Sequence, residues 1–369
     1  SISGGNYENL LPNTAPVTTT VTDDIDVTTV TLSAPASAAE GGAITYTATL
    51  TNAAASPVTV TLSTGETITI AAGATTGAVT IAAPTDDPHV DAGSVSRTIS
   101  TATGGGFESL AVNPAAATTS ITDTIDATTV SLSATASVAE GGSIVYTATL
   151  TNAAQTPVTV TLSTGQTITI AAGATTGTVS IAAPVDDPYV DAGSVSRTIS
   201  SATGGNFESL VIDAAAATTA VTDTIDVTTA TLTATPSVVE GGTITYTVSL
   251  AAPVAGSPVT VTLANGEVIT IGVGASSGTA TATAPDNVYA GGGSVTNSIA
   301  SAVGGNFENL APNSAPVTIA VTDDADVTTV SLGATASVVE GGTIVYTATL
   351  TSAAASPVTV TLSTGETIS

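Results

Sequence analysis

Cysteine, lysine, methionine and tryptophan are absent from this sequence of 369 residues. Without cysteine no disulfide can cross-link the chain, so small domains must be held by their cores or by bound metal ions. The basic side chains are two arginines and one histidine, so no cationic stripe can replace the counterions of a nucleic acid. Nucleic acids and anionic membrane surfaces are therefore excluded as partners.

Long apolar runs are also missing. No stretch of about 18 apolar residues occurs, so we expect no membrane insertion of this segment. The chain begins without a methionine or a signal peptide, and it starts and stops in the middle of a repeat. We therefore expect a window cut from a longer protein.

The residues that are abundant favour strands. The chain carries 29 acidic residues and a net charge of −27, yet only 8% of its residues are charged and the mean hydropathy is +0.46. Most of the remainder is Thr, Ala, Val, Ser, Gly and Ile. Val, Ile and Thr pack well on pleated sheets, whereas the long-chain helix formers are scarce. The composition predicts an all-β protein.

An internal repeat organises the chain. The tripeptide Glu-Gly-Gly recurs every one hundred residues, at Glu40, Glu140, Glu240 and Glu340. The predicted parts are a truncated tail 1–26, three complete repeats 27–126, 127–226 and 227–326, and a truncated head 327–369. Repeats of this length are large enough to have cores of their own.

Each repeat is predicted to hold seven strands. In the first, alternation and turn residues place them at 28–34, 43–51, 58–63, 67–71, 78–82, 94–101 and 118–125. Seven short strands in about one hundred residues are typical of an immunoglobulin-like β-sandwich. The two cysteines and the tryptophan of antibody domains are missing, so the prediction concerns architecture only. We expect these β-sandwich repeats to follow one another in a linear rod.

The acidic residues gather at one pole of each predicted sandwich. If successive strands alternate in direction, seven of the eight acids of the first repeat lie at its C-terminal pole. Glu108 lies at the opposite pole and faces the preceding repeat. Each junction between repeats then becomes a cluster of carboxylates. Glu66 is interpreted as an exposed turn residue, because the second repeat has Gln166 at its position.

Such a cluster needs protons or a cation, because like charges disfavour ionisation. Ca²⁺ accepts six to eight oxygen ligands in flexible geometry, whereas Mg²⁺ retains its waters and Zn²⁺ or Cu²⁺ needs His or Cys. We expect Ca²⁺; turn acids that only keep the chain soluble remain the alternative. The predicted ligands are Glu40, Asp86, Asp87, Asp91, Asp123, Asp126, Glu140, Asp186, Asp187, Asp191, Asp223, Asp226, Glu240, Asp286, Asp323, Asp326, Glu108, Glu208 and Glu308.

The third repeat departs from this pattern. Asn287 and Gly291 replace two loop acids, and Asp324 is gained next to Asp323. Neighbouring residues of a strand point to opposite faces, so Asp324 is expected to be a poor substitute. We therefore expect weaker calcium binding and more bending after Asp326 than after Asp226.

No catalytic site is expected. His89 aligns with Tyr189 and Tyr289, which indicates a loop aromatic rather than a general base. Paired carboxylates can hydrolyse glycosides, but here they recur at every junction, unlike an active site. Arg97 and Arg197 are expected to pair with an acid or cap a sheet edge. We predict no enzyme activity, no catalytic residue and no organic cofactor.

Whole segments of the sequence resemble a known family. They are VAEGGSIVYTATLTN at 138–152, TVTLSTGQTITIAAGATTGTVSIAAP at 159–184, DDPYVDAGSVS at 186–196, GGNFESL at 204–210 and VTDTID at 221–226. They are similar to the extender repeats of giant RTX/LapA-type biofilm adhesins, which Gram-negative bacteria export by type I secretion.

This resemblance implies a structural stalk at the cell surface. It would be extracellular, tethered to the outer membrane through regions outside this segment, with calcium between its repeats and a distal tip for cell adhesion. Its partners would be the neighbouring repeats of the same chain. Repeats that themselves bind glycan, ice or another copy of the adhesin remain the alternative, through hydroxyl arrays such as the Thr-rich run 58–63, and weak self-association stays open.

Overall fold

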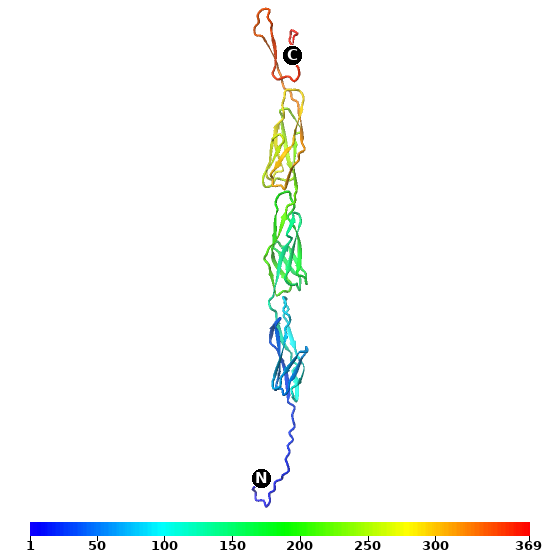
Figure 1. Cartoon of the computed structure of the whole chain (residues 1–369), viewed down its shortest axis with the longest axis vertical. Helices are drawn as coiled ribbons and strands as arrows, with labels where there is room; N and C mark the ends of the chain where they lie inside the picture. The colour runs from blue at the N-terminus through cyan, green and yellow to red at the C-terminus, as the bar shows by residue number, and fades with distance from the viewer. The chain divides into compact units, whose positions relative to one another are not determined.

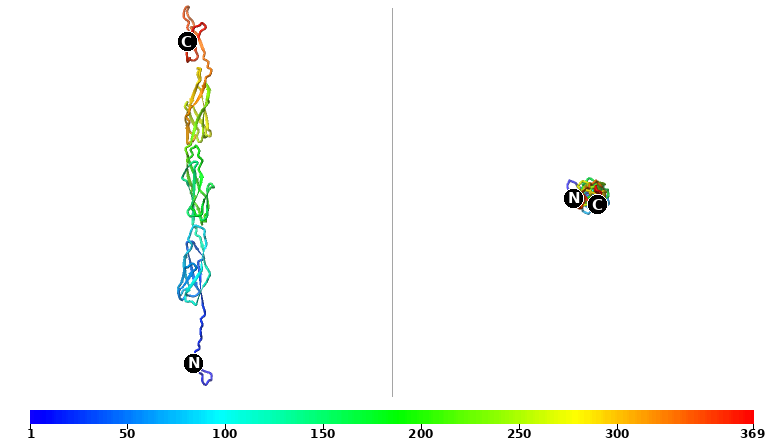
Figure 2. Two further views of the ribbon diagram at one scale, coloured as in Figure 1. Left: turned by 90° about the vertical axis from the view of Figure 1, so that its right-hand side faces the viewer. Right: turned by 90° about the horizontal axis from the view of Figure 1, so that it is seen from above.

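The computed structural model describes residues 1–369, and its regular elements are all β-strands (Figure 1). This confirms the all-β prediction from the Val, Ile and Thr content. Figure 2 shows from two further sides that the complete repeats consist of strands and the loops that connect them. No helix has the length and apolar character that a membrane span requires.

The first repeat contains ten strands. They are β1 (Val27–Ser33), β2 (Ser37–Ala39), β3 (Ala43–Leu50), β4 (Val58–Leu62), β5 (Thr67–Ile70), β6 (Thr76–Ala82), β7 (Ser94–Arg97), β8 (Ile99–Gly104), β9 (Ser109–Val112) and β10 (Ala117–Thr122).

The second repeat contains the equivalent strands. They are β11 (Ala127–Ala134), β12 (Ser137–Ala139), β13 (Ser143–Leu150), β14 (Val158–Leu162), β15 (Thr167–Ile170), β16 (Thr176–Ala182), β17 (Gly193–Arg197), β18 (Ile199–Gly204), β19 (Ser209–Ile212) and β20 (Ala217–Thr222).

The third repeat follows the same order. Its strands are β21 (Val227–Ala234), β22 (Ser237–Val239), β23 (Thr243–Leu250), β24 (Val259–Leu263), β25 (Val268–Ile271), β26 (Ser277–Thr283), β27 (Gly293–Asn297), β28 (Ile299–Val303), β29 (Asn309–Pro312) and β30 (Val317–Thr322).

The strands of the first repeat form two layers around a core. One layer is the sheet β6-β3-β1-β9; the other contains the sheets β2-β10-β7 and β5-β4-β8. β7 and β8 follow each other with Thr98 between them, so one segment of chain serves both smaller sheets. The third repeat has the same strand orders. This is the predicted immunoglobulin-like sandwich.

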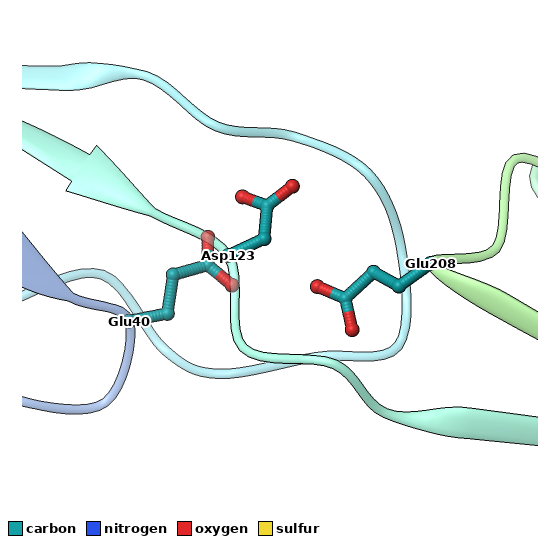
Figure 3. A group of neighbouring side chains, drawn as sticks. All are labelled: Glu40, Asp123 and Glu208. Atoms are coloured by element: carbon teal, nitrogen blue, oxygen red, sulfur yellow. The ribbon is translucent and has the colours of Figure 1, made fainter.

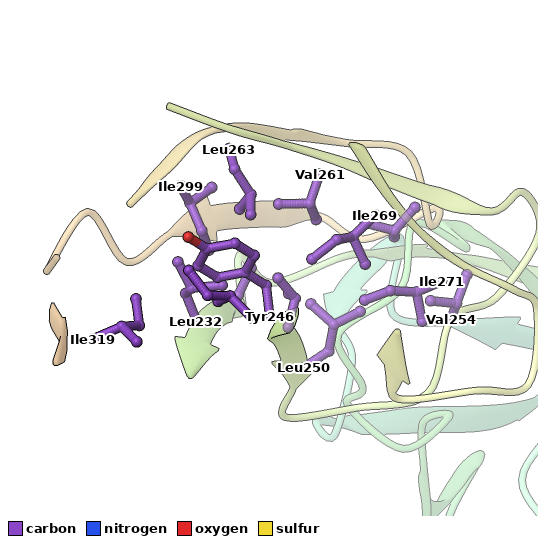
Figure 4. Close-up of a cluster of buried hydrophobic side chains, with 14 of the residues drawn as sticks. Leu232, Tyr246, Leu250, Val254, Val261, Leu263, Ile269, Ile271, Ile299 and Ile319 are labelled. Atoms are coloured by element: carbon purple, nitrogen blue, oxygen red, sulfur yellow. The ribbon is translucent and has the colours of Figure 1, made fainter. Parts of the chain in front are cut away.

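Period-two alternation fills the core. In β3 the side chains of Ile44, Tyr46, Ala48 and Leu50 are buried, as their alternation with threonines predicts. Figure 4 shows the corresponding core of the third repeat, where Tyr246 lies among aliphatic side chains. Burying one such aliphatic side chain stabilises the fold by about 1.5–3 kcal/mol.

Two short strands of each repeat are not predicted by the sequence. β2 pairs in parallel with β10, and β9 pairs in parallel with β1. Three or four residues are too few to show alternation, and their partners are distant in the sequence. The predicted strand 94–101 is divided at Thr98, and the predicted strand 118–125 ends at Thr122, so Asp123 and Asp126 follow the strand.

The two ends of the chain carry less structure. Residues 1–26 are exposed and form no strand. The final segment forms β31 (Val330–Ala334), β32 (Tyr346–Leu350), β33 (Val360–Thr361) and β34 (Thr367–Ile368).

The chain divides into two compact units. One comprises Ser1–Ser133, Tyr146–Val179 and Arg197–Ala217; the other comprises Ala134–Val145, Ser180–Ser196 and Thr218–Ser369. The junction that follows the first repeat lies within the first unit, and the junction that follows the second repeat lies within the second unit.

Candidate metal centres

Three carboxylates meet where the first repeat joins the second. Oxygens of Glu40, Asp123 and Glu208, which we call the first acidic triad, all lie within 4.8 Å of one another. Figure 3 shows the side chain of Glu208 reaching from the second repeat toward the two carboxylates of the first. The triad therefore draws on two consecutive repeats.

Strand pairing positions the two acids of the first repeat. β2 and β10 run in parallel with Ala39 opposite Thr122, so the next residues, Glu40 and Asp123, leave their strands side by side. The Glu40 N–H donates to the Thr122 carbonyl at 3.1 Å and continues the ladder by one residue. Two distant acids are thus fixed at one pole by backbone geometry.

A backbone clasp positions Glu208. The Glu208 N–H donates to the Pro88 carbonyl at 3.1 Å, and the Val90 N–H donates to the Asn206 carbonyl at 3.0 Å. Between these bonds the rings of His89 and Phe207 stack with their centroids 5.3 Å apart. A loop of the first repeat therefore holds a loop of the second by main-chain bonds and one aromatic contact.

The loop that carries Glu208 depends on glycine. Gly204 has φ +101°, and a Cβ atom there would lie 2.2 Å from the Pro157 carbonyl oxygen. Any other residue would be strained by the left-handed backbone and would also clash with this carbonyl. The Gly-Gly that precedes the aromatic residue is thus a geometric requirement of the clasp.

The carboxylate of Glu208 has two different oxygens. Oε2 accepts a hydrogen bond of 2.7 Å from the Asp126 N–H, where the first repeat ends. Oε1 is buried and has no hydrogen-bond partner. Oε2 thus ties Glu208 to the linker, and Oε1 stays available for another ligand.

The triad has unsatisfied acceptors. Besides Oε1 of Glu208, Oε2 of Glu40 and Oδ1 of Asp123 are buried without a hydrogen-bond partner, and Glu40 as a whole is only 6% exposed. Buried carboxylate oxygens are strongly destabilising unless a donor or a cation compensates them. Three in one place make the cluster a candidate cation site.

The electrostatics of Glu40 agree with this. The pKa of Glu40 is raised from 4.5 to about 7, first by a side-chain hydrogen bond with Asp91 and then by burial. The negative charges of Asp91, Asp123 and Asp87 add to the shift. The carboxylates repel one another, so without a cation the cluster favours taking up a proton.

The junction after the second repeat has the same construction. Glu140, Asp223 and Glu308 form the second acidic triad, again within 4.8 Å, and each contributes one buried, unpartnered oxygen. Glu308 Oε2 accepts from the Asp226 N–H at 2.6 Å. The pKa of Glu140 is raised to about 7, with a hydrogen bond to Asp191 as the largest cause.

The other predicted ligands are not members of the triads. In the first repeat Asp86 accepts a hydrogen bond from the Thr124 hydroxyl, and Asp87 accepts one of 2.9 Å from the His89 N–H. Glu108 lies at the other pole, where its Oε2 accepts from the Asp26 N–H at 2.7 Å. Asp186 and Asp187 bond in the second repeat as Asp86 and Asp87 do.

The third repeat assembles a different group. Glu240, Asp286 and Asp324 form the third acidic triad, within the same 4.8 Å, and all three belong to one repeat. The expectation that Asp324 points away from the cluster is wrong, because β30 ends at Thr322 and strand alternation no longer applies to Asp324. The comparison of the complete repeats was the available signal, since Asp324 stands where the first and second repeats have Thr124 and Thr224.

The triads fit a hard divalent cation. All donors are carboxylate oxygens, and because they lie within 4.8 Å of one another, one ion could contact all three at a Ca²⁺–oxygen distance of ~2.4 Å. Thiol and imidazole donors, which transition metals prefer, are absent from the triads. The residues that would hold the ion are thus the three members of each triad, with water completing the shell.

Comparison with known proteins identifies the repeats. No curated protein matches the sequence. Among solved structures, the native conformation of E. coli alpha-2-macroglobulin, determined by cryo-EM, is similar at 12% identity with a TM-score of 0.21. That match covers 83% of this chain and 24% of the other.

The family comparison is more informative. The sequence pattern of the LapA domain family matches residues 26–124, 126–224, 226–324 and 326–369, which is nearly the whole chain. Each match spans one copy of the repeat or the truncated copy at the end. The chain therefore belongs to the LapA domain family and is a tandem repeat region of a surface-associated, adhesin-type protein.

Proposed function

We propose that this chain is the stalk of a large bacterial surface adhesin and that Ca²⁺ at its junctions locks consecutive repeats together. One observation carries the proposal: Glu40, Asp123 and Glu208, from two repeats, bring carboxylate oxygens within 4.8 Å of one another, and each of these residues has a buried oxygen without a hydrogen-bond partner. Membership of the LapA family supports the setting that we propose for it: export by type I secretion, tethering to the outer membrane and a role in biofilm formation. The adhesive tip would lie outside this segment.

Calcium would act by coupling binding to docking. The full set of oxygens exists only when Glu208 is clasped against the first repeat, so an ion that binds all three favours the docked arrangement over the separated one. The same coupling works in reverse, because docking raises the affinity for the ion. A flexible string of domains thereby becomes stiffer in the presence of calcium.

The charge of the chain explains why an ion would be needed. A net charge of −27 concentrated at the poles makes neighbouring repeats repel each other. One Ca²⁺ per triad would neutralise two of these charges where they lie closest together. The repulsion would then give way to a bridge at the same position.

Use of the pole loops favours a spacer over a binding module. Sandwich domains that bind ligands commonly do so with loops at their poles. Here the loops that contain His89 and Phe207 are engaged with each other, as are those that contain Tyr189 and Phe307. Loops engaged in this way are not free to recognise a distant ligand.

The test is a calcium titration of the full chain, followed by thermal unfolding and small-angle scattering. At a Ca²⁺ concentration one hundred times Kd, binding to the folded state is worth about 2.7 kcal/mol, which should raise Tm by about 10 °C. Scattering should give a larger maximum dimension in calcium than in EDTA.

Matched variants connect the effect to the triads. Glu208→Gln with Glu308→Gln should remove at least half of the calcium-dependent rise in Tm, because it neutralises one ligand of both bridging triads. Glu66→Gln is the control, since the second repeat has Gln166 at that position and folds into the same strands. Equal Tm values in EDTA and in calcium for the parent chain would overturn the proposal.

A further inference from the structure

Each complete repeat has one long strand with an unpaired outer edge. β6 lies at the end of the sheet β6-β3-β1-β9 and is hydrogen-bonded to β3 alone. The strands β16 and β26 hold the same position in the second and third repeats. A strand at the edge of a sheet carries a row of free N–H and C=O groups, which can pair with a further strand.

The ladder between β3 and β6 shows which backbone groups are free. At one end of the ladder the Leu50 N–H donates to the Thr75 carbonyl at 2.8 Å. At the other end the Ala83 N–H donates to the Gly42 carbonyl at 3.0 Å. An antiparallel ladder alternates between these two bonds, so every second residue of β6 turns its N–H and C=O groups away from β3. The residues with outward groups are Thr76, Ala78, Thr80 and Ala82.

β6 has none of the features that usually protect a sheet edge, which are short length, charge, proline or a β-bulge. The other edge strands of the first repeat have such features. β2, β5, β7 and β9 have three or four residues, and the pairing of β8 with β4 shifts register between Thr61 and Leu62. β6 has seven residues without charge or proline, in unbroken register with β3. The equivalent segments TGTVSIA at 176–182 and SGTATAT at 277–283 also lack charge and proline.

Apolar side chains next to this edge are incompletely covered. Val79 and Ile81 pack against the core, yet both are only half-buried. Their partners on the interior strand β3, Tyr46 and Ile44, are fully buried. A further strand next to β6 would cover the exposed part of Val79 and Ile81, and burial of apolar surface favours association.

We propose that the β6 edge pairs in antiparallel orientation with the β6 edge of a second copy of this chain. The strand is complementary to itself. About a twofold axis at Val79, Ala78 lies opposite Thr80 of the second copy, and Thr76 lies opposite Ala82 of the second copy. In this register every free N–H of one strand meets a free C=O of the other.

The two faces of the sheet favour antiparallel over parallel pairing. A twofold axis perpendicular to the sheet reverses the strand and keeps the core-facing sides of both sheets on the same side. Val79 and Ile81 then adjoin the same residues of the second copy. Parallel pairing of the two edges needs an axis along the strand, which would place the apolar side of one sheet next to the threonine-bearing side of the other.

Charge and periodicity favour a second copy over an unrelated peptide as the partner. The net charge of −27 makes two copies repel each other, but no acid lies between Glu66 and Asp86, the segment that contains β6. The free edges begin at residues 76, 176 and 277, so a second copy carries the same edges at the same separation along the chain. Several weak pairings can then act together, which a single peptide strand cannot provide.

Pairing of this kind would let two stalks bind each other. Antiparallel strands belong to repeats that run in opposite directions, as in stalks that extend from two facing cells. This role rests on the proposed function of the chain as a surface stalk, whereas the pairing itself needs no metal ion.

Sedimentation equilibrium of the full chain tests the pairing. The buffer contains EDTA and about 1 M NaCl, because a Debye length of ~3 Å screens the repulsion between acidic copies. We expect the mean mass to rise with concentration from the monomer value of 35.2 kDa toward that of a dimer. A chain that stays monomeric up to millimolar concentration overturns the proposal.

Proline variants locate the contact. Thr80→Pro, combined with Ser180→Pro and Thr281→Pro at the equivalent positions, removes an outward N–H from each edge and leaves the bonds to β3 in place. Loss of these bonds should raise the Kd of the dimer by about tenfold or more. The matched control replaces the same three residues by valine, which keeps the N–H, and it should associate like the parent. Proline variants that associate like the parent, or valine variants that are weakened equally, contradict backbone pairing.

Glutamate variants keep the test decisive if circular dichroism shows that the proline variants unfold. Ala78→Glu, with Thr178→Glu and Thr279→Glu, places acids on the edges and retains every N–H. The charge-matched control is Thr59→Glu with Thr159→Glu and Thr260→Glu, on the central strands of the other layer. The edge variants should raise Kd by about tenfold or more, and the control should do so much less. Equal effects of the two sets would show that net charge, not the β6 edge, governs association.

Failure of this inference can be told from failure of the proposed function. The effect of calcium on Tm is measured on the same parent chain. If calcium raises Tm but the chain stays monomeric, only the strand pairing is wrong. If the chain associates through β6 and calcium leaves Tm unchanged, the pairing stands and the calcium-locked stalk is wrong.

Discussion

Tyr189 and Phe307 belong to consecutive repeats, and their rings stack with centroids 5.3 Å apart and an angle of 27° between the planes. The Tyr189 hydroxyl also donates a hydrogen bond of 2.5 Å to the Pro253 carbonyl. Backbone bonds from Val190 to Asn306 and from Glu308 to Pro188 flank the pair. The junction is thus preassembled by neutral contacts next to the acidic triad.

The aromatic pair should be measurable as a coupling energy. In a double-mutant cycle, Tyr189→Ala and Phe307→Ala should show a coupling of about 0.5–1.5 kcal/mol, the usual value of a stacked pair beyond its buried area. The measurement is the free energy of unfolding in denaturant. Phe307→Ala combined with Tyr289→Ala is the control, because these residues lie at opposite poles of the third repeat and their effects should add.

Stability without calcium should fall as the pH rises. The pKa of Glu40 and of Glu140 is about 7 in the folded chain, against 4.5 as the ordinary value. A raised pKa means that the folded state holds the proton more tightly than the unfolded state. The stability that this proton contributes to the fold is therefore complete below pH 4.5 and is lost as the pH rises through 7. Thermal unfolding in EDTA should therefore give a lower Tm at pH 8 than at pH 5.

Calcium should reverse this dependence. The ion requires deprotonated ligands, so its affinity should increase as the pH rises through the same range. A variant with Glu40→Gln and Glu140→Gln should lose the pH dependence seen in EDTA. A Tm in EDTA that is constant between these pH values would show that the triads are not coupled carboxylates.

Gly204 should not tolerate a side chain. Gly204→Ala combines a left-handed backbone with a contact of 2.2 Å to the Pro157 carbonyl, and we expect a loss of about 1–3 kcal/mol in the free energy of unfolding. Gly165→Ala is the matched control: φ is +89°, but no atom lies within 4 Å of the added carbon. It should be destabilising by only about 1 kcal/mol. Equal losses would show that the carbonyl contact relaxes freely.

The hydroxyl of Tyr46 should be dispensable. The side chain is fully buried, and its hydroxyl oxygen has no hydrogen-bond partner. Tyr46→Phe removes an unsatisfied polar group and should leave the free energy of unfolding unchanged or slightly higher. Tyr46→Ala leaves a cavity in the core and should be destabilising by about 3–5 kcal/mol. A clear loss in Tyr46→Phe would mean that ordered water satisfies the hydroxyl.

Much of the fold can be predicted from the sequence, because the geometry of a strand imposes a simple alternation of apolar and polar residues. Side chains alternate between two faces, so the buried set of β3, from Ile44 to Leu50, is visible as every second residue. The spacing of the Glu-Gly-Gly tripeptides marks the repeat in the same direct way. The alternating direction of successive strands also predicts that Glu208 faces the acids of the preceding repeat, and in the structure it lies next to Glu40 and Asp123.

The short strands and the broken one could not be predicted. β2 and β9 have three and four residues, and each exists because a distant strand pairs with it. The division at Thr98 arises because the two halves of that segment join different sheets. These elements are defined by pairing with strands that are distant in the sequence, and such pairing leaves no periodic pattern in the local sequence.

The sequence by itself determined that carboxylates collect at each junction, since alternating strands and loop lengths assign every acid to a pole. Only the tertiary structure decided which oxygens meet. Asp86 is held by Thr124, while Glu40, Asp123 and Glu208 converge, and Asp324 joins a triad that its neighbour Asp323 does not. The reason is physical: beyond the last residue of a strand the side-chain direction no longer alternates, and it is set by contacts between residues that are distant in the chain.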